Sequence, residues 1–189
     1  MKGYDIKVRL DDFRPLTWRD LIIPYDITFH QLHLIMQELW DFYDGHLYEF
    51  TTSSYTTKYV DFKRMDVDNN YIPDYGELDS RTHYISELFD SNNKIKYYYD
   101  FGDSWSFTIE IKKQVEYDKT YPTIKRFKGD YNPVEDCGGV FGLSMMIDST
   151  KEYDDELNIF NLEDKQEELE INCSFINNDK KVIIPNMIV

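Results

Sequence analysis

The chain has 189 residues, of which 41% are hydrophobic and 16% aromatic, and it carries a formal net charge of −15. This length and apolar content exclude a wholly disordered chain and suffice to bury a core. Cations must neutralise phosphates when a protein binds nucleic acid or an anionic membrane, so the acidic balance disfavours both partners. One local basic patch remains conceivable, from Lys112, Lys113, Lys125, Arg126 and Lys128.

The cysteine content and the start of the chain indicate a cytoplasmic protein. Cys137 and Cys173 are too few for a disulfide framework, and free thiols are typical of a reducing compartment. Residues 1–5 lead directly into an alternating pattern, so we expect no signal peptide. No apolar run approaches the roughly 20 residues of a membrane span, so we expect no membrane partner.

The first half of the chain predicts two strands, a helix and two more strands. Apolar and charged residues alternate over 4–10, which is typical of a strand, and 17–24 predicts a second one. Thr28, followed three residues later by Gln31, fits a capping box, so we expect a helix to begin at Phe29. Its apolar face would consist of Phe29, Leu32, Ile35, Met36, Leu39 and Trp40. The next two strands are expected at 47–52 and 58–63.

The second half predicts a hairpin followed by helical and extended segments. We expect, in order, a polar loop at 66–81, a short helix near 84–89, a hairpin at 94–112, a loop at 117–131, a short helix within 137–147, an acidic amphipathic helical region at 148–170 and a final strand at 182–189. The predicted fold is a single α+β domain over 1–189, with a mostly antiparallel sheet and one main helix packed on it. A β-grasp-like core is one arrangement that fits, because two strands precede the main helix.

The hairpin has a sharply defined pattern. Ile95, Tyr97, Tyr99 and Phe101 alternate with polar residues, and so do Trp105, Phe107, Ile109 and Ile111. A three-residue loop at 102–104 puts all eight on one face by pairing Phe101 with Trp105. It also sets Lys96 opposite Glu110 and, unfavourably, Lys94 opposite Lys112. Such a loop needs a residue with positive φ, which Gly102 or Asp103 could supply.

Five motifs in a fixed order resemble a known family. They are Trp18-Arg19, Thr28-Phe29 with Leu32-His33, the run from His46 to Phe50, the run from Tyr99 to Trp105, and the run from Pro133 to Gly139. Together they resemble the plasmid pRiA4b ORF-3-like family, whose bacterial and archaeal members are often encoded on mobile elements. The resemblance covers roughly residues 3–147, with an acidic helical tail also usual. It implies a single α+β domain and supplies no established biochemical activity.

Three positions depart from the pattern of that family. Members commonly carry His at the positions of Tyr48 and Phe107 and Cys at the position of Asn132, and all three are potential metal ligands. The residues present here are unsuited to zinc. If relatives share a metal site, the resemblance implies that this chain has lost it, so we expect no metal and no cofactor.

The best candidate for chemistry is the acidic turn with its single thiol. Cys137 stands beside Gly138 and Gly139 at an expected helix start, where exposed backbone amides lower a thiol pKa. Glu135 and Asp136 oppose thiolate formation. A nucleophilic or redox role for Cys137 stays open beside a structural turn and a ligand or partner contact, and Glu135 and Asp136 are the other candidates for chemistry at this turn.

The remaining candidates are binding residues. Asp100 and Asp103 are expected to bond turn amides rather than a metal, since the chain lacks the glycine-rich and His-Arg-Asp loops of a kinase. His33 should be a packed histidine at the edge of the core, and His46 stands beside a strand start. A metal site from His33, His46 and Cys137 is conceivable, but no spacing requires it. The candidate binding set is Asp100, Asp103, Trp105, Glu135, Asp136, Cys137, Gly138, Gly139, His33 and His46.

Three classes of function fit these observations. The leading hypothesis is a non-catalytic binding or interaction domain, because no complete catalytic constellation is visible. The second is an accessory protein of a mobile element acting in DNA transactions, which rests on the resemblance. The third is a small enzyme that uses Cys137 or the Glu135/Asp136 pair. A protein partner or a small ligand is preferred over nucleic acid, and a homodimer is one assembly that fits.

Overall fold

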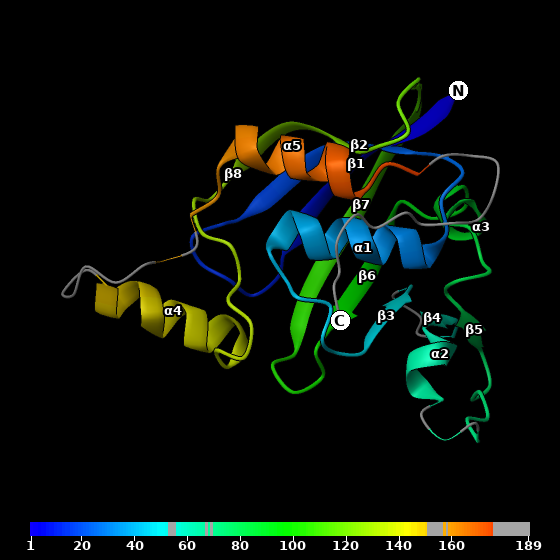
Figure 1. Ribbon diagram of the computed structural model, residues 1–189, viewed down its shortest axis with the longest axis horizontal. Coiled ribbons are helices and arrows are strands. Elements are labelled where there is room, and N and C mark those ends of the chain that lie inside the picture. Colours follow the sequence, from blue (N-terminus) through cyan, green and yellow to red (C-terminus); the bar gives the residue numbers. More distant parts are fainter. Residues whose placement is uncertain (53–55, 67, 69, 151–156, 158, 176–189) are drawn as a thin grey trace.

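The computed structural model describes residues 1–52, 56–66, 68, 70–150, 157 and 159–175 (Figure 1). The strands are β1 (Lys2–Leu10), β2 (Trp18–Pro24), β3 (Tyr48–Thr51), β4 (Lys58–Val60), β5 (Glu77–Asp79), β6 (Lys94–Tyr99), β7 (Trp105–Glu116) and β8 (Thr123–Lys128). The helices are α1 (Phe29–Trp40), α2 (Phe62–Met65), α3 (Ser86–Phe89), α4 (Gly139–Thr150) and α5 (Leu162–Asn172). The predicted strand at 182–189 lies outside the described residues.

The strands form one sheet in the order β5-β4-β3-β6-β7-β1-β2-β8. Every pairing in it is antiparallel except that between β4 and β5. The chain is therefore an α+β structure with a large, mostly antiparallel sheet, as predicted. A β-grasp-like core is not confirmed: β1, which lies between β7 and β2, pairs antiparallel with both of these neighbours.

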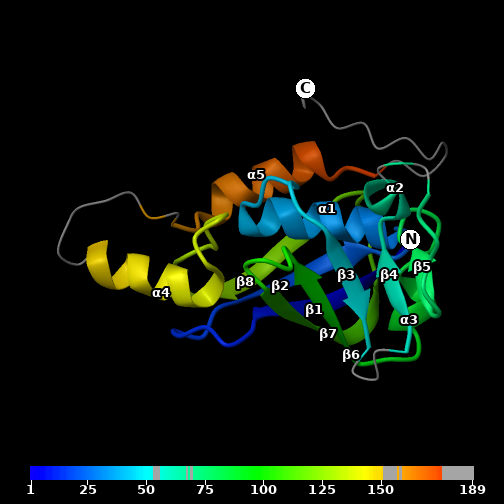
Figure 2. The same ribbon diagram turned by 90° about the horizontal axis from the view of Figure 1, so that it is seen from below.

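Helix α1 begins where the capping box predicts. Thr28 Oγ1 accepts from the Gln31 backbone N at 3.2 Å, and Gln31 Oε1 accepts from the Thr28 N at 2.8 Å. The predicted apolar face, from Phe29 to Trp40, is at most 1% exposed and packs on the sheet. Helix α5 lies beside α1 on the same side of the sheet (Figure 2).

The expectation of one main helix is not confirmed. Helices α1 and α4 each span 12 residues and α5 spans 11. Helix α4 falls in the segment predicted to be a short helix after a glycine turn, and α5 falls in the predicted acidic region. Asn161 caps α5 through its side-chain oxygen, which accepts from the backbone N of Glu163 at 2.9 Å.

Two predicted loops contain short edge strands, and one predicted strand is shorter than expected. Strand β5 lies in the loop at 66–81 and β8 in the loop at 117–131. Both are short, polar and at the ends of the sheet, so they carry little apolar alternation to signal a strand. The strand expected at 58–63 ends at Val60, because Asp61 caps α2 by accepting from the backbone N of Lys63.

The aromatic hairpin keeps its predicted faces but not its predicted register. Tyr99 pairs with Trp105, so the loop spans five residues, 100–104, rather than three. Phe101 leaves the strand and is 54% exposed. A shift of two residues leaves every strand side chain on the same face, so alternation alone cannot distinguish the two registers.

The charges and the loop backbone account for the observed register. Lys94 now faces Glu110, with 3.2 Å between Nζ and Oε1, and the repulsive pairing of Lys94 with Lys112 is avoided. Positive φ falls on Asp100 (53°) and Ser104 (58°) rather than on Gly102 or Asp103. Among the described residues, no helix is long and apolar enough to cross a membrane.

Candidate functional site

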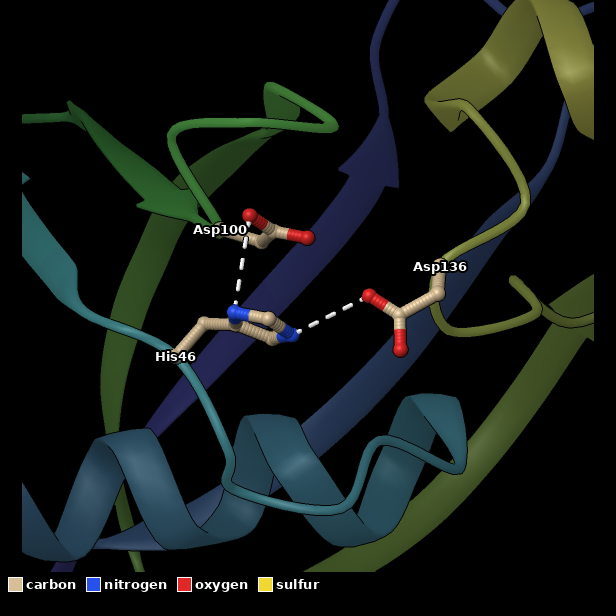
Figure 3. A group of neighbouring side chains, drawn as sticks. All are labelled: His46, Asp100 and Asp136. Carbon is tan, nitrogen blue, oxygen red and sulfur yellow. Dashed lines mark ion pairs between the residues drawn. The ribbon is translucent and has the colours of Figure 1, made fainter.

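Three segments that are distant in sequence meet at one end of the sheet (Figure 3). His46 comes from the connection between α1 and β3, Asp100 from the end of β6, and Asp136 from the turn before α4. Candidate ligand atoms of the three side chains lie within 4.8 Å of one another. The structure thus brings together three residues that the sequence could only nominate separately.

The His46 ring stands between carboxylates. Its Nδ1 lies 3.7 Å from Asp100 Oδ1, while its Nε2 lies 3.4 Å from Asp136 Oδ1 and 3.6 Å from Glu135 Oε1. Asp100 is 8% exposed and Asp136 is 79% exposed at the side chain, so the cluster runs from the edge of the core to solvent. A protonated His46 would form ion pairs on both edges of its ring.

Imidazole and carboxylates are ligand types that bind divalent metals. In this arrangement, however, Asp100 and Asp136 face opposite nitrogens of the His46 ring. A metal ion bound to one nitrogen of the imidazole ring would have one of these carboxylates on the opposite side of the ring, out of reach. The geometry therefore favours ion pairing over metal coordination. The metal site considered from the sequence, made of His33, His46 and Cys137, does not form among the described residues, because the buried His33 ring contacts Asp44 instead.

Glu135 ties the acidic turn to the hairpin. Its Oε1 accepts from the Tyr99 hydroxyl at 2.5 Å, and its Oε2 accepts from the Tyr43 backbone N at 2.8 Å. The Tyr99 hydroxyl in turn accepts from the Gly45 N at 3.1 Å. Burial and the adjacent Glu135 carboxylate raise the pKa of Tyr99, which keeps its hydroxyl a proton donor. Glu135 is consequently a structural link as well as a wall of the site.

The environment of Cys137 opposes a reactive thiolate. Burial and the nearby Asp103 carboxylate raise the pKa of Cys137, contrary to the lowering that the glycine turn predicts. Its Sγ donates to the Gly139 carbonyl at 3.5 Å. Gly138 and Gly139 have φ of 90° and 67°, and the Gly138 N donates to Asp103 Oδ2 at 3.0 Å. These contacts are those of a turn that fixes the start of α4.

Two predicted binding residues lie in the core. Trp105 is fully buried and packs against Phe42, with 5.7 Å between ring centroids. His33 is also fully buried, stacked on Tyr48 at 3.6 Å, with Nε2 2.5 Å from Asp44 Oδ1. These positions favour packing roles, which for His33 the sequence predicts.

The positions that depart from the family pattern have different surroundings. The rings of Tyr48 and Phe107 both neighbour Tyr97, at centroid distances of 6.3 and 5.9 Å. Asn132 instead accepts from Arg19 Nη2 at 2.9 Å and donates to Asp41. The side chains present at these positions thus serve in aromatic packing and in a buried hydrogen-bond network.

A groove of about 660 Å³ adjoins the His46 cluster and shares Glu135 with it. It runs between the C-terminal end of α1, the segment before α4, and α4 and α5. Its polar walls include Glu38, Asp41, Glu135 and Glu168. Its apolar walls are Phe42, Tyr43, Pro133, Val134, Met146 and Leu157. The groove thus combines negative charge with exposed apolar surface.

Lys165 is held at the acidic wall and cannot neutralise it. Its Nζ donates to both Asp41 and Glu168 and lies 3.9 Å from Glu38, while the residue is 5% exposed. Burial raises the pKa of Glu38, and Glu168 adds to this rise although Lys165 opposes it. Three carboxylates of the groove, Glu38, Asp41 and Glu168, therefore share the Lys165 ammonium. The sequence motifs missed this wall because its acids come from two helices and a turn.

Comparisons with known proteins identify relatives but no activity. The chain matches the family model described as "Plasmid pRiA4b ORF-3-like protein" over residues 2–172. It is 30% identical over 139 residues to the uncharacterized protein y4hQ of Sinorhizobium fredii (strain NBRC 101917 / NGR234), covering 72% of this chain and 67% of y4hQ. It is also similar to the crystal structure of the protein of unknown function MM3350 from Methanosarcina mazei Go1, with a TM-score of 0.64, 26% identity, and 87% of this chain and 86% of that chain covered.

Proposed function

The chain belongs to the plasmid pRiA4b ORF-3-like protein family, and from that premise we propose that it is a non-catalytic binding domain whose acidic groove receives a basic segment of a protein partner. The observation that carries the proposal is the combination of four carboxylates and six apolar side chains around one groove. A lysine or arginine with apolar neighbours matches both kinds of wall.

The charge distribution in the groove supports a cationic occupant. Glu38 and Glu168 are 23% and 46% exposed at the side chain, so an incoming ammonium or guanidinium group can reach them. Burial raises the pKa of Glu38, and repulsion from the Glu168 carboxylate makes a smaller contribution in the same direction. A bound cation would reduce that repulsion, whereas an anion would add to it.

The apolar walls support a peptide rather than a free metal ion or a polyamine. Tyr43 is 78% exposed, and Phe42, Pro133 and Val134 continue its surface into the groove. Met146 of α4 lies among the lining residues, and flexible thioether side chains adapt to varied apolar partners. Recognition of an amphipathic basic segment uses both the charge and this apolar area.

The environment of Cys137 gives the enzyme alternative no support. A nucleophilic cysteine needs a lowered pKa and an adjacent base, whereas here burial and Asp103 raise the pKa. Among the ring contacts and ion pairs of the described residues, His46 interacts with Asp100, Glu135, Asp136 and Tyr99 rather than with the thiol.

Fluorescence anisotropy with a labelled peptide of leucine and lysine tests the proposal, with the same peptide bearing glutamate for lysine as the charge control. The proposal predicts saturable binding of the lysine peptide alone. The double variant Glu38→Gln/Glu168→Gln should weaken binding about fivefold or more, since each partly exposed ion pair contributes up to about 1 kcal/mol.

The matched control is Glu167→Gln/Glu170→Gln, which removes two exposed carboxylates from α5 that do not line the groove. It should leave the affinity within about twofold, because neither side chain lines the groove and both are exposed to solvent, which weakens their interaction with the peptide. An equal loss of affinity in both double variants would mean that the peptide responds to the net charge of the protein and does not bind in the groove. Absence of saturable binding to the lysine peptide would contradict the proposal.

A further inference from the structure

The face of the sheet opposite α1 and α5 has no helix on it in the part of the chain that the structure describes (Figure 2). Its strands β1, β2, β6, β7 and β8 carry charged side chains there. The cations are Lys7, Arg9, Lys96, Lys112, Lys125 and Arg126. Three buried carboxylates, Asp5, Asp11 and Asp20, accompany them, and the partly exposed pair of Lys94 and Glu110 lies on the same face, with Glu110 opposite Lys7.

Asp20 and Asp5 anchor the first group of cations. Lys112 Nζ lies 2.8 Å from Asp20 Oδ1, and Arg126 Nε donates to Asp20 Oδ2 at 2.6 Å. Lys125 Nζ donates to Asp5 Oδ2 at 2.7 Å, and Lys112 lies 4.0 Å from Asp5. Both carboxylates are buried, Asp20 at 0% and Asp5 at 5% exposure. The cations therefore lie over the acids rather than beside them.

Asp11 anchors the second group on the same face. Lys96 Nζ donates to Asp11 Oδ2 at 2.6 Å, and Arg9 Nη2 donates to Asp11 Oδ1 at 3.0 Å. Thr108 Oγ1 adds a hydrogen bond at 2.8 Å. Asp11 is 7% exposed, whereas the Arg9 side chain is 42% exposed. Here too the carboxylate is covered and the cation faces solvent.

The carboxylates stay ionised and hold the cations in place. Burial alone would raise the pKa of Asp20, but Lys112 and Arg126 outweigh it and lower the pKa below its usual value. Lys96 and Thr108 do the same for Asp11. Six cations over three buried carboxylates, with Lys94 and Glu110 cancelling each other, leave a surface with excess positive charge on a chain of net charge −15.

The overall charge does not decide what this face can bind. Exposed charges are screened beyond a Debye length, which is about 10 Å at 0.1 M salt. The acidic groove lies among helices on the other side of the sheet. A polyanion on the basic face therefore interacts mainly with the cations beneath it. The basic patch conceived from the sequence is partly realised, because Lys112, Lys125 and Arg126 meet here.

We infer that this open sheet face binds the phosphate backbone of a nucleic acid. Arg9 and Arg126 offer guanidinium groups, and the surrounding lysines offer ammonium groups, to several phosphates at once. Lys7 Nζ lies 4.2 Å from the Trp18 ring centroid and Arg126 lies 5.6 Å from it, so the half-buried indole supports the cations rather than stacking bases. Binding is consequently electrostatic and independent of sequence.

Anisotropy of a labelled 20-base-pair DNA duplex and a 20-nucleotide single strand, measured at several salt concentrations, tests this inference. Arg9→Gln and Arg126→Gln should each weaken binding about two- to fivefold and reduce the salt slope by about one. Both variants should fold, because each buried carboxylate retains an ion pair: Asp11 with Lys96, and Asp20 with Lys112. The control Lys63→Gln removes an exposed cation from α2 and should leave binding unchanged.

Saturable binding of either oligonucleotide that both arginine variants weaken and Lys63→Gln does not supports the inference. The oligonucleotide with the higher affinity shows whether the face prefers double-stranded or single-stranded DNA. No binding of either, or binding that both arginine variants retain in full, would overturn it. So would binding of heparin without binding of DNA, or self-association that the same variants abolish. The groove variant Glu38→Gln/Glu168→Gln should bind DNA at least as well as wild type, so this inference and the proposed function can fail separately.

Discussion

The Tyr99 hydroxyl donates to Glu135 Oε1 at 2.5 Å, joining the end of β6 to the turn that precedes α4. Glu135 is 6% exposed at the side chain and lines the groove, so this hydrogen bond holds one groove wall against the sheet. The same carboxylate accepts from the Tyr43 N, which positions the exposed tyrosine at the groove rim.

Removing that hydroxyl should destabilise the fold. Tyr99→Phe leaves a poorly exposed carboxylate without its shortest donor, and hydrogen bonds to charged groups contribute about 1.5–3 kcal/mol. We expect a loss of that order in the free energy of unfolding, measured by urea denaturation. Tyr75→Phe, at a fully exposed tyrosine, should change it by less than about 0.5 kcal/mol. A similar loss in the free energy of unfolding for both variants would contradict a structural role of the hydrogen bond between Tyr99 and Glu135.

Gly139 should tolerate no side chain. Its φ is 67°, and a Cβ there would stand 2.2 Å from the Asp103 carbonyl oxygen. Gly139→Ala therefore combines backbone strain of about 1 kcal/mol with a clash against backbone. We expect a loss of about 2 kcal/mol or more in thermal or urea unfolding. Gly45→Ala is the control, since the nearest atom to its Cβ would be 3.8 Å away. A neutral Gly139→Ala would show that the turn can move.

Buried histidines should make stability fall in mild acid. Burial, assisted by Arg81 and His33, lowers the pKa of His30, and burial lowers the pKa of His33 although Asp44 opposes it. The unfolded chain takes up these protons near pH 6.5, whereas the folded chain does so at lower pH. Stability is therefore fully present above about pH 6.5 and decreases as pH falls below it.

Urea denaturation at intervals from pH 7.5 to 5 measures this slope, in a window above the usual titration of carboxylates. Each unit of pKa difference costs about 1.4 kcal/mol once the unfolded histidine is protonated. His30→Gln should flatten the slope, because one of the two groups is then absent. An unchanged slope in His30→Gln, with the fold intact, would contradict the assignment.

The thiols should react slowly. Burial raises the pKa of Cys173, which is 1% exposed, and burial with Asp103 raises the pKa of Cys137. In native protein at pH 7.5, labelling by a thiol reagent should be slower at Cys137 than in a free cysteine peptide and slower still at Cys173. Labelling of Cys137 faster than the peptide would revive the enzyme alternative.

Local signals predicted the elements whose causes are local. The capping box of Thr28 and Gln31 and the periodicity after it predicted α1, and alternation predicted which hairpin residues face the core. The hairpin register needed the loop backbone at Asp100, whose N donates to the Leu47 carbonyl at 3.0 Å. That contact joins segments 53 residues apart, so no local pattern reports it.

The sites depended on such distant contacts even more strongly. His46, Asp100 and Asp136 were nominated separately, but their meeting could not be predicted from spacing. The acidic groove was missed because its acids come from the end of α1 (Glu38 and Asp41), the turn before α4 (Glu135) and α5 (Glu168), which no local pattern connects. The net charge of −15 gave no sign of the basic face, because it sums buried and exposed groups without regard to where they lie on the surface.

The most direct test of the acidic groove is a map of where a cationic peptide binds. Amide chemical shifts of ¹⁵N-labelled protein, recorded while the unlabelled leucine and lysine peptide is added, report contacts residue by residue. The proposed function predicts the largest changes at Glu38, Asp41, Tyr43 and Glu168, with small changes at Glu167 and along β1. Changes spread evenly over the acidic surface, or centred away from the groove, would contradict it.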